Sequence, residues 1–316
     1  MIPQDMKLSI IIPVYNSTTT LAPLVASLAA ELEESYQLEV LLINDGSPNS
    51  ATAPTCLQLA KEHPWVKFLD LSRNFGEHNA VMAGLTHCTG EAAVIIDDDL
   101  QHPPAEVKKL VEKLAQGHDV VYSRFPQKEH ALLRNLGSWL HNRMATVMLN
   151  KPRDLYLSSF KAINRFLIDE LIRYTGPYPY VDGLIWQVTH NHAVVEITHQ
   201  PRQTGQSGYT FLKLLSLWSN MFTSFSILPL RAAIWLGFLF AGVGLVSAVL
   251  FFIEKLVNPG LPVGWASMMI FLLVLSGIQL MGIGMIGEYL GRLYLKNNNT
   301  PQFVVRRAFN CEVKKE

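Results

Sequence analysis

Charged side chains are what this 316-residue sequence has least of. Lys, Arg, Asp and Glu make up 16% of the chain and hydrophobic residues 49%, which is apolar for a soluble protein. Two stretches, 232–253 and 256–287, contain no charged side chain. Each reaches the roughly 20 apolar residues that a helix needs to cross a bilayer. We therefore expect two membrane-spanning helices, at about 232–253 and 265–287, rather than two buried core helices.

The sequence also lacks the marks of a secreted protein. Its three cysteines (Cys56, Cys88 and Cys311) show neither metal-ligand spacing nor an even number for pairing, which fits a reducing cytosol. The N-terminal run "KLSIIIPVYN" is too short and too soon interrupted for a signal peptide. Positive charge follows the second predicted span, whereas only Lys255 lies between the spans. The positive-inside rule then predicts that both termini are cytosolic.

An excess of charge of either sign is missing too. The net charge is zero, and of the 26 basic and 26 acidic residues, eight and four follow residue 230. That leaves 18 basic and 22 acidic side chains in the first 230 residues. Such a balance argues against a nucleic acid as partner. A polyanionic substrate would have to be met by local arginines or by a metal ion.

What the first 125 residues do contain is an alternation of β-branched runs with helical patterns. Such an alternation predicts βαβ units and an α/β fold with a mostly parallel sheet. Ligands of such sheets bind at the carboxyl ends of the strands, and here every such end is polar. The runs lie at 8–12, 40–43, 66–71, 92–96 and 119–123, and the helical patterns at 20–34, 53–62, 77–87 and 104–116.

Between this region and the first span lies an amphipathic stretch. Residues 209–228 place apolar side chains on one helical face and polar ones on the other, which predicts a helix lying in the membrane interface. An ordinary core-packing helix is the alternative. The expected organisation is a cytosolic domain, an interfacial helix, two spans and a cytosolic tail, at 1–208, 209–230, 231–290 and 291–316.

Three consecutive carboxylates, Asp97, Asp98 and Asp99, follow the fourth predicted strand. In an extended segment Asp97 and Asp99 would share one side. Two close carboxylates raise each other's pKa unless a cation lies between them. Mg²⁺ or Mn²⁺ prefers such oxygen ligands, and Gln101 adds another. The alternative, an acidic loop capping the helix near Pro104, explains one carboxylate but not three.

Two further polar segments end neighbouring strands. Asp45, in "NDGS", could accept a hydrogen bond from a nucleobase or a ribose, although this tetrapeptide is also an ordinary turn. Arg73, in "RNFGEHNA", lies near the same edge, although a single loop arginine is usually solvated. The histidines, among them His78, His102 and His141, show no metal spacing and are expected in loops or at the surface.

In this order, "PVYN" (13–16), "NDGS" (44–47), "RNFGEHNA" (73–80) and "DDDLQHPP" (97–104) resemble the inverting GT-A glycosyltransferases. Later motifs narrow the resemblance to polyprenyl-phosphate glycosyltransferases, similar to dolichol-phosphate mannose synthase. The nearest resemblance is to bacterial bactoprenol glucosyltransferases of the GtrB type, and it covers nearly the whole chain. These later motifs are "SRF", "RDLYLSSF", "YPYVDGLI", "RQTGQSGYTFLKL" and "SFSILPLR".

The resemblance implies roles for individual residues. It places a Mg²⁺ or Mn²⁺ ion with the donor diphosphate on Asp97, Asp99 and Gln101, with Asp98 reaching the ribose or ordering the loop. It implies that arginines handle phosphate groups and that a later loop binds a lipid phosphate. By the resemblance, the nucleotide is bound by Pro13, Tyr15, Asp45 and Arg73, and phosphate groups are bound by Arg124 and Arg134. The lipid phosphate is bound by Arg202 and Ser207 with Tyr209 or Lys213.

The implied reaction is attack of a polyprenyl (undecaprenyl) phosphate oxygen on the anomeric carbon of a nucleotide sugar, with inversion. UDP-glucose is the default donor, followed by GDP-mannose, UDP-N-acetyl sugars and a 4-amino-arabinose donor. If a carboxylate assists as base, Asp154 is the first candidate and Asp182 the second; each could instead be a turn or helix cap. The enzyme would work at the bacterial cytoplasmic membrane as an integral protein.

Three other classes of protein are the alternatives to this one. A processive polysaccharide synthase should carry a Q-x-x-R-W motif and more spans, and a nucleotidyltransferase a Gly-rich phosphate loop near the N-terminus; the sequence has neither. A non-catalytic, membrane-anchored sugar-nucleotide sensor stays open, but would not need Arg202 and Ser207. The Gly-rich segment 282–291 permits close helix approach, and thus a homo-oligomer.

Overall fold

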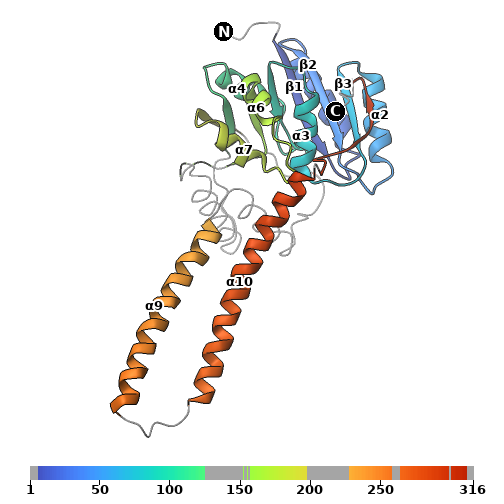
Figure 1. Ribbon diagram of the computed structural model, residues 1–316. Coiled ribbons are helices and arrows are strands. Elements are labelled where there is room, and N and C mark those ends of the chain that lie inside the picture. The colour runs from blue at the N-terminus through green and yellow to red at the C-terminus, as the bar shows by residue number, and fades with distance from the viewer. Residues whose placement is uncertain are drawn as a thin grey trace. The chain divides into compact units, whose positions relative to one another are not determined.

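The computed structural model describes residues 6–124, 152, 155, 157–197, 228–257, 264–298 and 300–311. The chain forms two compact units (Figure 1). The first consists of Met1–Tyr209 together with Asn299–Glu316, and the second of Thr210–Asn298. The C-terminal segment therefore returns to the unit with which the chain begins.

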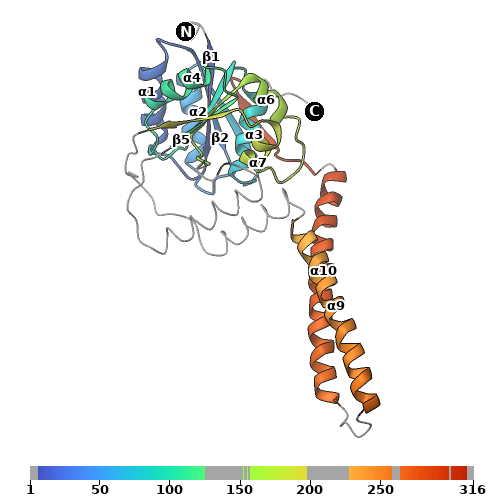
Figure 2. The same ribbon diagram turned by 90° about the vertical axis from the view of Figure 1, so that its left-hand side faces the viewer.

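The first unit is built on an eight-stranded sheet with the order β7-β5-β6-β4-β1-β2-β3-β8. Figure 2 shows β1, β2 and β5 of this sheet among the helices of the unit. The four central strands, β4, β1, β2 and β3, run parallel. β7 pairs parallel with β5, whereas β6 and β8 run antiparallel to their neighbours. The strands are β1 (Lys7–Val14), β2 (Gln37–Asn44), β3 (Val66–Leu71), β4 (Ala92–Ile95), β5 (Val120–Arg124), β6 (Lys161–Asn164), β7 (His192–Glu196) and β8 (Val305–Phe309).

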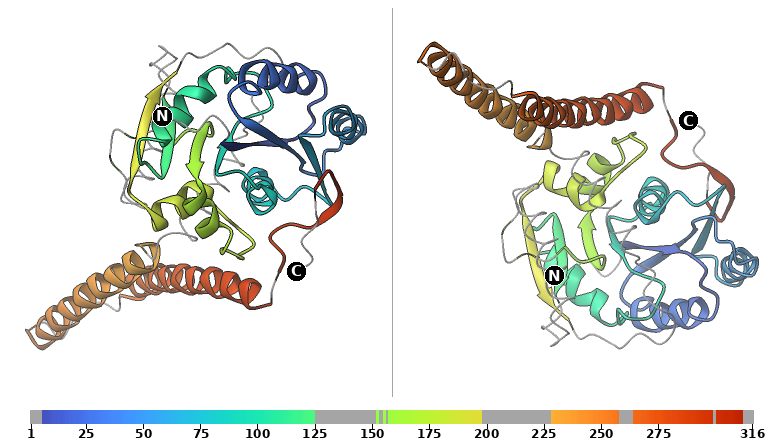
Figure 3. Two further views of the ribbon diagram at one scale, coloured as in Figure 1. Left: turned by 90° about the horizontal axis from the view of Figure 1, so that it is seen from above. Right: turned by 90° about the horizontal axis from the view of Figure 1, so that it is seen from below.

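Helices cover both faces of this sheet (Figure 3). Ile10 and Ile12 of β1 join one core cluster with buried residues of α1, α2 and α4. Ile11 faces the other way, toward α3, where a Cβ on Gly84 would lie 2.6 Å from its side chain. The helices of this unit are α1 (Leu21–Leu32), α2 (Thr52–Glu62), α3 (Glu77–His87), α4 (Glu106–Leu114), α6 (Arg165–Leu171) and α7 (Val181–Val188).

Local sequence explains the central elements. β1 is apolar from Ile10 to Val14 because helices bury both of its faces, as is usual in parallel sheets. α4 buries Val107, Leu110, Val111 and Leu114, the spacing of one helical face. The predicted α/β fold with a mostly parallel sheet is confirmed, and β1 to β5 and α1 to α4 overlap the ranges expected from the sequence.

The remaining strands were not predicted. β6 and β7 lie in the stretch 130–200, whose pattern is irregular, and β8 lies in the segment expected to be a tail. Residues 305–309 form an edge strand on β3 although more than 200 residues separate the two in sequence. Such a pairing has no local sequence signature, because the partner strand supplies the other half of the hydrogen bonds.

The second unit contains two long helices, α9 (Leu228–Val257) and α10 (Trp265–Asn297). Among the described residues one segment, Val274–Leu295 in α10, is long and apolar enough to cross a membrane. The apolar part of α9, Ala233–Ser247, is shorter. One of the two expected spans therefore has a counterpart, and the second stays a prediction. The expected interfacial helix lies outside the described residues up to residue 227, and 228–230 begin α9.

Candidate functional site

The motif-bearing loops meet at the carboxyl ends of the four central strands. Each loop contains one residue in the left-handed region of backbone space, where L-residues are uncommon. When such residues are not glycine they concentrate at functional sites, since the surrounding structure must hold them. The left-handed residues are Asn16 after β1 (φ 62°), Gly46 after β2 (φ 56°), Gly76 after β3 (φ 95°) and Leu100 after β4 (φ 61°).

Asp45 joins the loop after β2 to the loop after β3. Its side chain is 3% exposed and accepts hydrogen bonds from the backbone N–H groups of Phe75, at 2.7 Å, and Gly76, at 2.9 Å. Burial raises the pKa of Asp45, although these two hydrogen bonds oppose the rise. Both carboxylate oxygens are therefore engaged by protein backbone, and the expected contact of Asp45 with a nucleotide stays a prediction.

Gly46 makes the same junction tight. A Cβ at this position would lie 2.2 Å from the carbonyl carbon of Arg73 and 2.3 Å from the nitrogen of Asn74. Such distances are far inside van der Waals contact, and the neighbouring atoms are backbone. Only glycine allows the two loops to lie backbone against backbone here. The "NDGS" tetrapeptide is thus more than an ordinary turn.

The other residues expected at the nucleotide lie on the same edge. Arg73 is exposed, and its guanidinium lies 4.4 Å from the centre of the Phe75 ring. Tyr15 is 49% exposed, and its backbone N–H donates to Asp98 at 3.3 Å. Pro13 is half-buried within β1, opposite Ile43 of β2. The strand ends thus bring Pro13, Tyr15 and Arg73 to the edge that carries the aspartates.

Asp97 has protein partners from two directions. Its Oδ2 accepts a hydrogen bond from the Ser159 hydroxyl at 2.7 Å and lies 3.2 Å from Nε2 of His102. Burial alone would raise the pKa of Asp97, but the contacts with His102 and Ser159 and the charge of Lys161 lower it overall. His102 is 5% exposed and stacks on Phe160. His102 therefore lies in a loop, as expected, but it is buried there rather than placed at the surface.

Asp98 and Asp99 lie in a turn, because β4 already ends at Ile95. Asp98 accepts from the Tyr15 backbone, whereas Asp99 accepts from the backbone N–H of Gln101 at 3.1 Å. Strand alternation, from which Asp97 and Asp99 were expected on one side, does not apply to this turn. Burial raises the pKa of Asp98 to about 6, and the charges of Asp97 and Asp99 add to the rise.

A metal site is not resolved by these contacts. Within the described ranges, no group of three His, Cys, Asp or Glu side chains converges as a cation site would require. The oxygens of Asp97, Asp99 and Gln101 are nonetheless the type that Mg²⁺ and Mn²⁺ prefer. Their role as ligands stays a prediction.

Asp182, the second candidate base, is a partner in a buried ion pair. It lies in the first turn of α7, is 6% exposed, and contacts Nζ of Lys161. The Tyr122 hydroxyl donates to the same carboxylate oxygen at 3.3 Å. The contact with Lys161 thus engages this oxygen with a buried protein donor. This contact argues against Asp182 as the proton acceptor.

Sequence reasoning missed Lys161, Ser159 and His102 as parts of the site. Lys161 begins β6 and pairs in register with Ile95 at the end of β4, just before the aspartates. It is 3% exposed, which is rare for lysine without a partner. If β6 had been recognised as a strand, the burial of Lys161 could have been predicted, because Lys161 and Ile163 then share one face of a buried strand.

Arg124 is exposed at the end of β5, where it pairs in register with Glu196 of β7. It thus also lies at a carboxyl end of the sheet. The other predicted site residues lie outside the described part of the chain, and the structure does not test them. They are Arg134, Asp154, Arg202, Ser207, Tyr209 and Lys213.

Comparison with known proteins identifies relatives along the whole chain. Bactoprenol glucosyl transferase of Shigella phage SfX is 33% identical over 95% of this chain and 99% of its own length. The uncharacterised glycosyltransferase YkcC of Bacillus subtilis (strain 168) is 31% identical over 99% of this chain and 97% of its own. A prophage bactoprenol glucosyl transferase homologue of Escherichia coli (strain K12) is 30% identical over 96% and 99%.

Solved structures confirm the fold. Glucosyl-3-phosphoglycerate synthase from Mycobacterium tuberculosis superposes with a TM-score of 0.53, covering 70% of this chain and 80% of its own at 15% identity. The GT-A fold implied by the sequence motifs is thereby supported. Residues 9–172, from β1 through α6, match glycosyl transferase family 2. With full-length glycosyltransferase relatives above 30% identity, this chain is a glycosyltransferase and belongs to glycosyl transferase family 2.

Proposed function

We propose that this glycosyltransferase transfers glucose from UDP-glucose, with inversion, to a polyprenyl phosphate at the cytosolic face of the bacterial cytoplasmic membrane. The observation that carries the proposal is the extent of the match to the bactoprenol glucosyl transferase of phage SfX. That match covers 95% of the chain, well beyond residues 9–172 of the family domain. A shared acceptor would explain why the similarity continues outside the donor-binding fold.

The donor assignment rests on the strand-end loops. In another crystal structure, glucosyl-3-phosphoglycerate synthase of Mycobacterium tuberculosis holds Mn²⁺ and UDP-glucose on a fold with a TM-score of 0.52 to this chain. The carboxyl edge of the sheet in this chain carries Tyr15, Arg73 and the three aspartates. We assign the nucleotide to Pro13, Tyr15 and the loops ordered by Asp45, with Arg73 beside them.

The residues at the end of β4 suit a divalent cation. Asp97, Asp98 and Asp99 are consecutive, and burial, together with repulsion from Asp97 and Asp99, raises the pKa of Asp98 to about 6. A cation would relieve this repulsion. We assign Mg²⁺ or Mn²⁺ to Asp97, Asp99 and Gln101, where it would neutralise charge that develops on the departing diphosphate. Ser159 and His102 hold Asp97 in place for that role.

The acceptor needs little activation. A phosphate monoester has a second pKa of about 6 and is largely dianionic at neutral pH, so its oxygen can attack the anomeric carbon without losing a proton. The greater difficulty is the approach of one polyanion to another, which arginines relieve by bidentate contacts. We assign this task to Arg124 and Arg134, and the lipid phosphate to Arg202 and Ser207 with Tyr209 or Lys213.

Any base would then have a supporting role. Asp154 remains the first candidate, and the contact with Lys161 leaves Asp182 as a weak one. Lys161 instead places a buried positive charge near Asp97, whose pKa it helps to lower. We therefore assign Lys161, which Asp182 holds in place, to keeping Asp97 ionised.

The second unit suits an acceptor whose tail stays in the bilayer. Val274–Leu295 is long and apolar enough to span it, and large side chains such as Trp235 and Phe238 of α9 are more than two-thirds exposed. We propose two spans, an interfacial helix over 209–230, and cytosolic termini. The glycines of 282–291 have no atom within 4 Å of a built Cβ in the described chain, so they could accept a helix of a second copy in a homo-oligomer.

The test is transfer of labelled glucose from UDP-glucose to undecaprenyl phosphate by the full-length protein with Mg²⁺, followed by extraction of the lipid. We expect a glucosyl lipid of inverted configuration, and slower transfer from GDP-mannose and from UDP-N-acetyl sugars. A preference for one of those donors would overturn the sugar assignment. Release of free glucose without any lipid product would overturn the acceptor assignment.

A further inference from the structure

We propose that the C-terminal strand β8 positions the loops that hold the donor nucleotide, and that Arg307 is the positioning residue. The inference rests on the proposed function, because it takes the edge formed by the loops after β1 and β2 as the nucleotide site. β8 follows the helix α10 in the chain and lies in the catalytic unit. The segment after the membrane-spanning region would thus complete the active site.

β8 is held firmly against the edge of the sheet. It pairs antiparallel with β3, with Arg307 opposite Asp70 and Phe309 opposite Phe68. At its far end, Asn310 donates to the backbone carbonyls of Ala60, at 2.6 Å, and Val66, at 2.9 Å. The pairing with β3 places Arg307 beside Asp70, whereas the contacts of Asn310 secure only the end of the strand.

Arg307 meets a buried carboxylate. Its Nη2 and Nε donate to Oδ2 of Asp70 at 2.7 and 3.0 Å. Asp70 is 5% exposed, and its other oxygen, Oδ1, accepts from the side-chain nitrogen of Asn44 at 2.8 Å. Arg307 therefore supplies the positive charge for a carboxylate that would be costly to bury unpaired.

Asp70 in turn fixes the orientation of the Asn44 amide. Because the side-chain nitrogen of Asn44 faces Asp70, the side-chain oxygen of Asn44 faces the loop after β2. That oxygen accepts from the Ser47 hydroxyl at 2.6 Å and from the Ser47 N–H at 3.3 Å. If the Asn44 amide were flipped, its NH₂ group would face the N–H of Ser47, donor against donor. Its oxygen would then face the carboxylate of Asp70, acceptor against acceptor. The charge of Asp70 thus selects one orientation of Asn44.

Ser47 carries the arrangement into the loop after β1. Its Oγ accepts from the backbone N–H of Asn16 at 3.0 Å, and the Asn16 side chain accepts from the N–H of Asn49 at 3.1 Å. Asn16 has a φ of 62° and directly follows Tyr15. A continuous chain of hydrogen bonds therefore runs from Arg307 to both loops assigned to the nucleotide, and supporting contacts of this kind set the precision of a binding site.

The test compares two variants of the same strand in the full-length protein. Arg307→Ala removes the start of the chain, whereas Asn310→Ala loosens the strand at its far end without touching the chain. For Arg307→Ala we expect KM for UDP-glucose to rise about tenfold with kcat within about twofold, because ground-state binding is affected. Arg307→Lys, which keeps the charge but not the paired donors, should recover part of the loss.

A second readout needs no donor. Hydrogen exchange at the amides of Asn16, Ser47 and Asn49 should quicken in Arg307→Ala and stay at the wild-type rate in Asn310→Ala. Unchanged KM and exchange in Arg307→Ala, or the same changes in both variants, would overturn the inference. If wild-type protein fails to use UDP-glucose, the donor assignment fails, and the exchange of these three amides still decides whether Arg307 orders the loops.

Discussion

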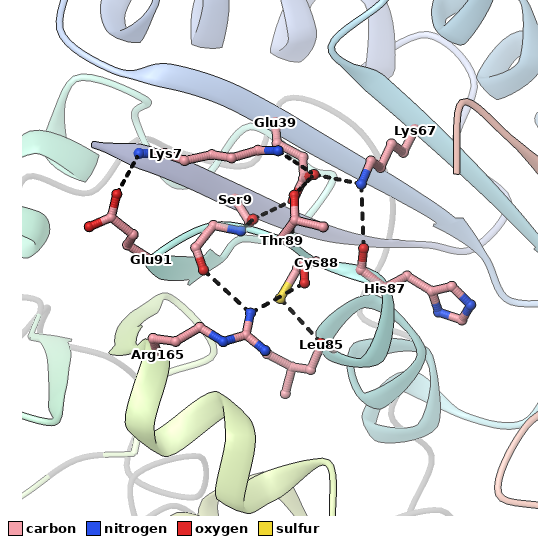
Figure 4. A network of polar contacts seen from close by, with 11 residues as sticks. Lys7, Ser9, Glu39, Lys67, Leu85, His87, Cys88, Thr89, Glu91 and Arg165 are labelled. Atoms are coloured by element: carbon pink, nitrogen blue, oxygen red, sulfur yellow. Dashed lines mark hydrogen bonds and ion pairs between the residues drawn. The ribbon is translucent and has the colours of Figure 1, made fainter. Parts of the chain in front are cut away.

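The two ends of the central sheet treat buried charge in opposite ways. At the amino ends of the strands, a single carboxylate, Glu39 of β2, is surrounded by donors (Figure 4). At the carboxyl ends, three aspartates stand in consecutive positions after β4. Both groups belong to the same parallel part of the sheet, one near the start of a strand and the other just after a strand's end, so the difference reflects their surroundings rather than the fold as such.

Glu39 is fully provided with partners. It is 3% exposed and forms an ion pair with Lys67 at 2.6 Å, while Thr89 donates to it through its backbone N–H at 2.9 Å and its hydroxyl at 2.6 Å. Burial alone would raise the pKa of Glu39, but hydrogen bonds from Lys67, Ser9 and Thr89 lower it to about 2. This carboxylate stays ionised and has no capacity left for a ligand.

Two aspartates at the other end, Asp98 and Asp45, are less well compensated. Burial raises the pKa of Asp98 to about 6 and raises that of Asp45, against the hydrogen bonds each receives. Uncompensated charge costs stability, but it leaves oxygens that a cation or a substrate group can engage. The amino end of the sheet is therefore built for stability. The carboxyl end keeps carboxylate charge that is only partly compensated, and a bound ligand can supply the missing compensation.

The largest effect is expected from Asp99→Asn, which keeps the shape and the acceptor for Gln101 but removes a charge. If Asp99 holds a cation, transfer to the polyprenyl phosphate should fall about 10³-fold, because charge stabilisation in the transition state is lost. The melting temperature should stay within about 2 °C of wild type. Transfer assays and thermal unfolding of the same preparation measure both.

Asp169→Asn is the matched control, since Asp169 pairs with Arg165 on the exposed face of α6. It should leave transfer and melting near their wild-type values, as expected for a surface ion pair. Wild-type transfer rates in Asp99→Asn with Mg²⁺ present would remove Asp99 from the proposed metal site.

The reverse pattern is expected from Glu39→Ala at the amino ends. Removing one partner of a buried ion pair costs about 3 kcal/mol, which lowers the melting temperature by roughly 6–12 °C in a domain of this size. Below that temperature, kcat should remain within about twofold of wild type. A loss of kcat in protein that is still folded would show that the two ends are not independent.

Gly46→Ala tests how tightly the loops after β2 and β3 are joined. The new methyl group would clash with the backbone at Arg73 and Asn74, so we expect about 1–3 kcal/mol of destabilisation and a KM for UDP-glucose raised about tenfold. Gly117→Ala is the control, because Gly117 also has a positive φ, of 99°, but nothing lies within 4 Å of a built Cβ. It should lose stability without a change in KM.

Much of the carboxyl-end site could be located from the sequence. The alternation of β-branched runs and helical patterns identified five strands, and the rule that ligands bind at carboxyl ends placed the aspartates, Tyr15 and Arg73 at one edge. The rule of alternating side chains failed for Asp98 and Asp99, because β4 ends at Ile95 and a turn follows. Strand ends are less certain than strands, since no periodicity marks them.

The partners of these residues could not be predicted. Asp97 contacts Ser159, Asp182 contacts Lys161, and Asp70 contacts Arg307, across separations of 62, 21 and 237 residues. Each contact depends on β6, α7 or β8 taking its place beside strands formed much earlier in the chain. Strand order and register decide such contacts, and a local pattern carries neither.

The smallest expected effect is a change in stability with pH that depends on Glu39 at the amino ends. The pKa of Glu39 is about 2 in the folded chain, against an ordinary value of 4.5. The stability that the ionised Glu39 contributes to the folded chain is therefore complete above about pH 5 and is lost as the pH falls toward 2. At about pH 3.5, wild type should have lost about 1.4 kcal/mol through this group alone. Glu39→Gln, which cannot titrate, should not show that part of the loss, so the stability difference between the two proteins should narrow by this amount between about pH 7 and pH 3.5.

Melting curves of both proteins across this range measure the difference, in which the other carboxylates cancel. A constant difference would mean that Glu39 is not held ionised by Lys67, and the contrast with the carboxyl ends would then rest on geometry alone.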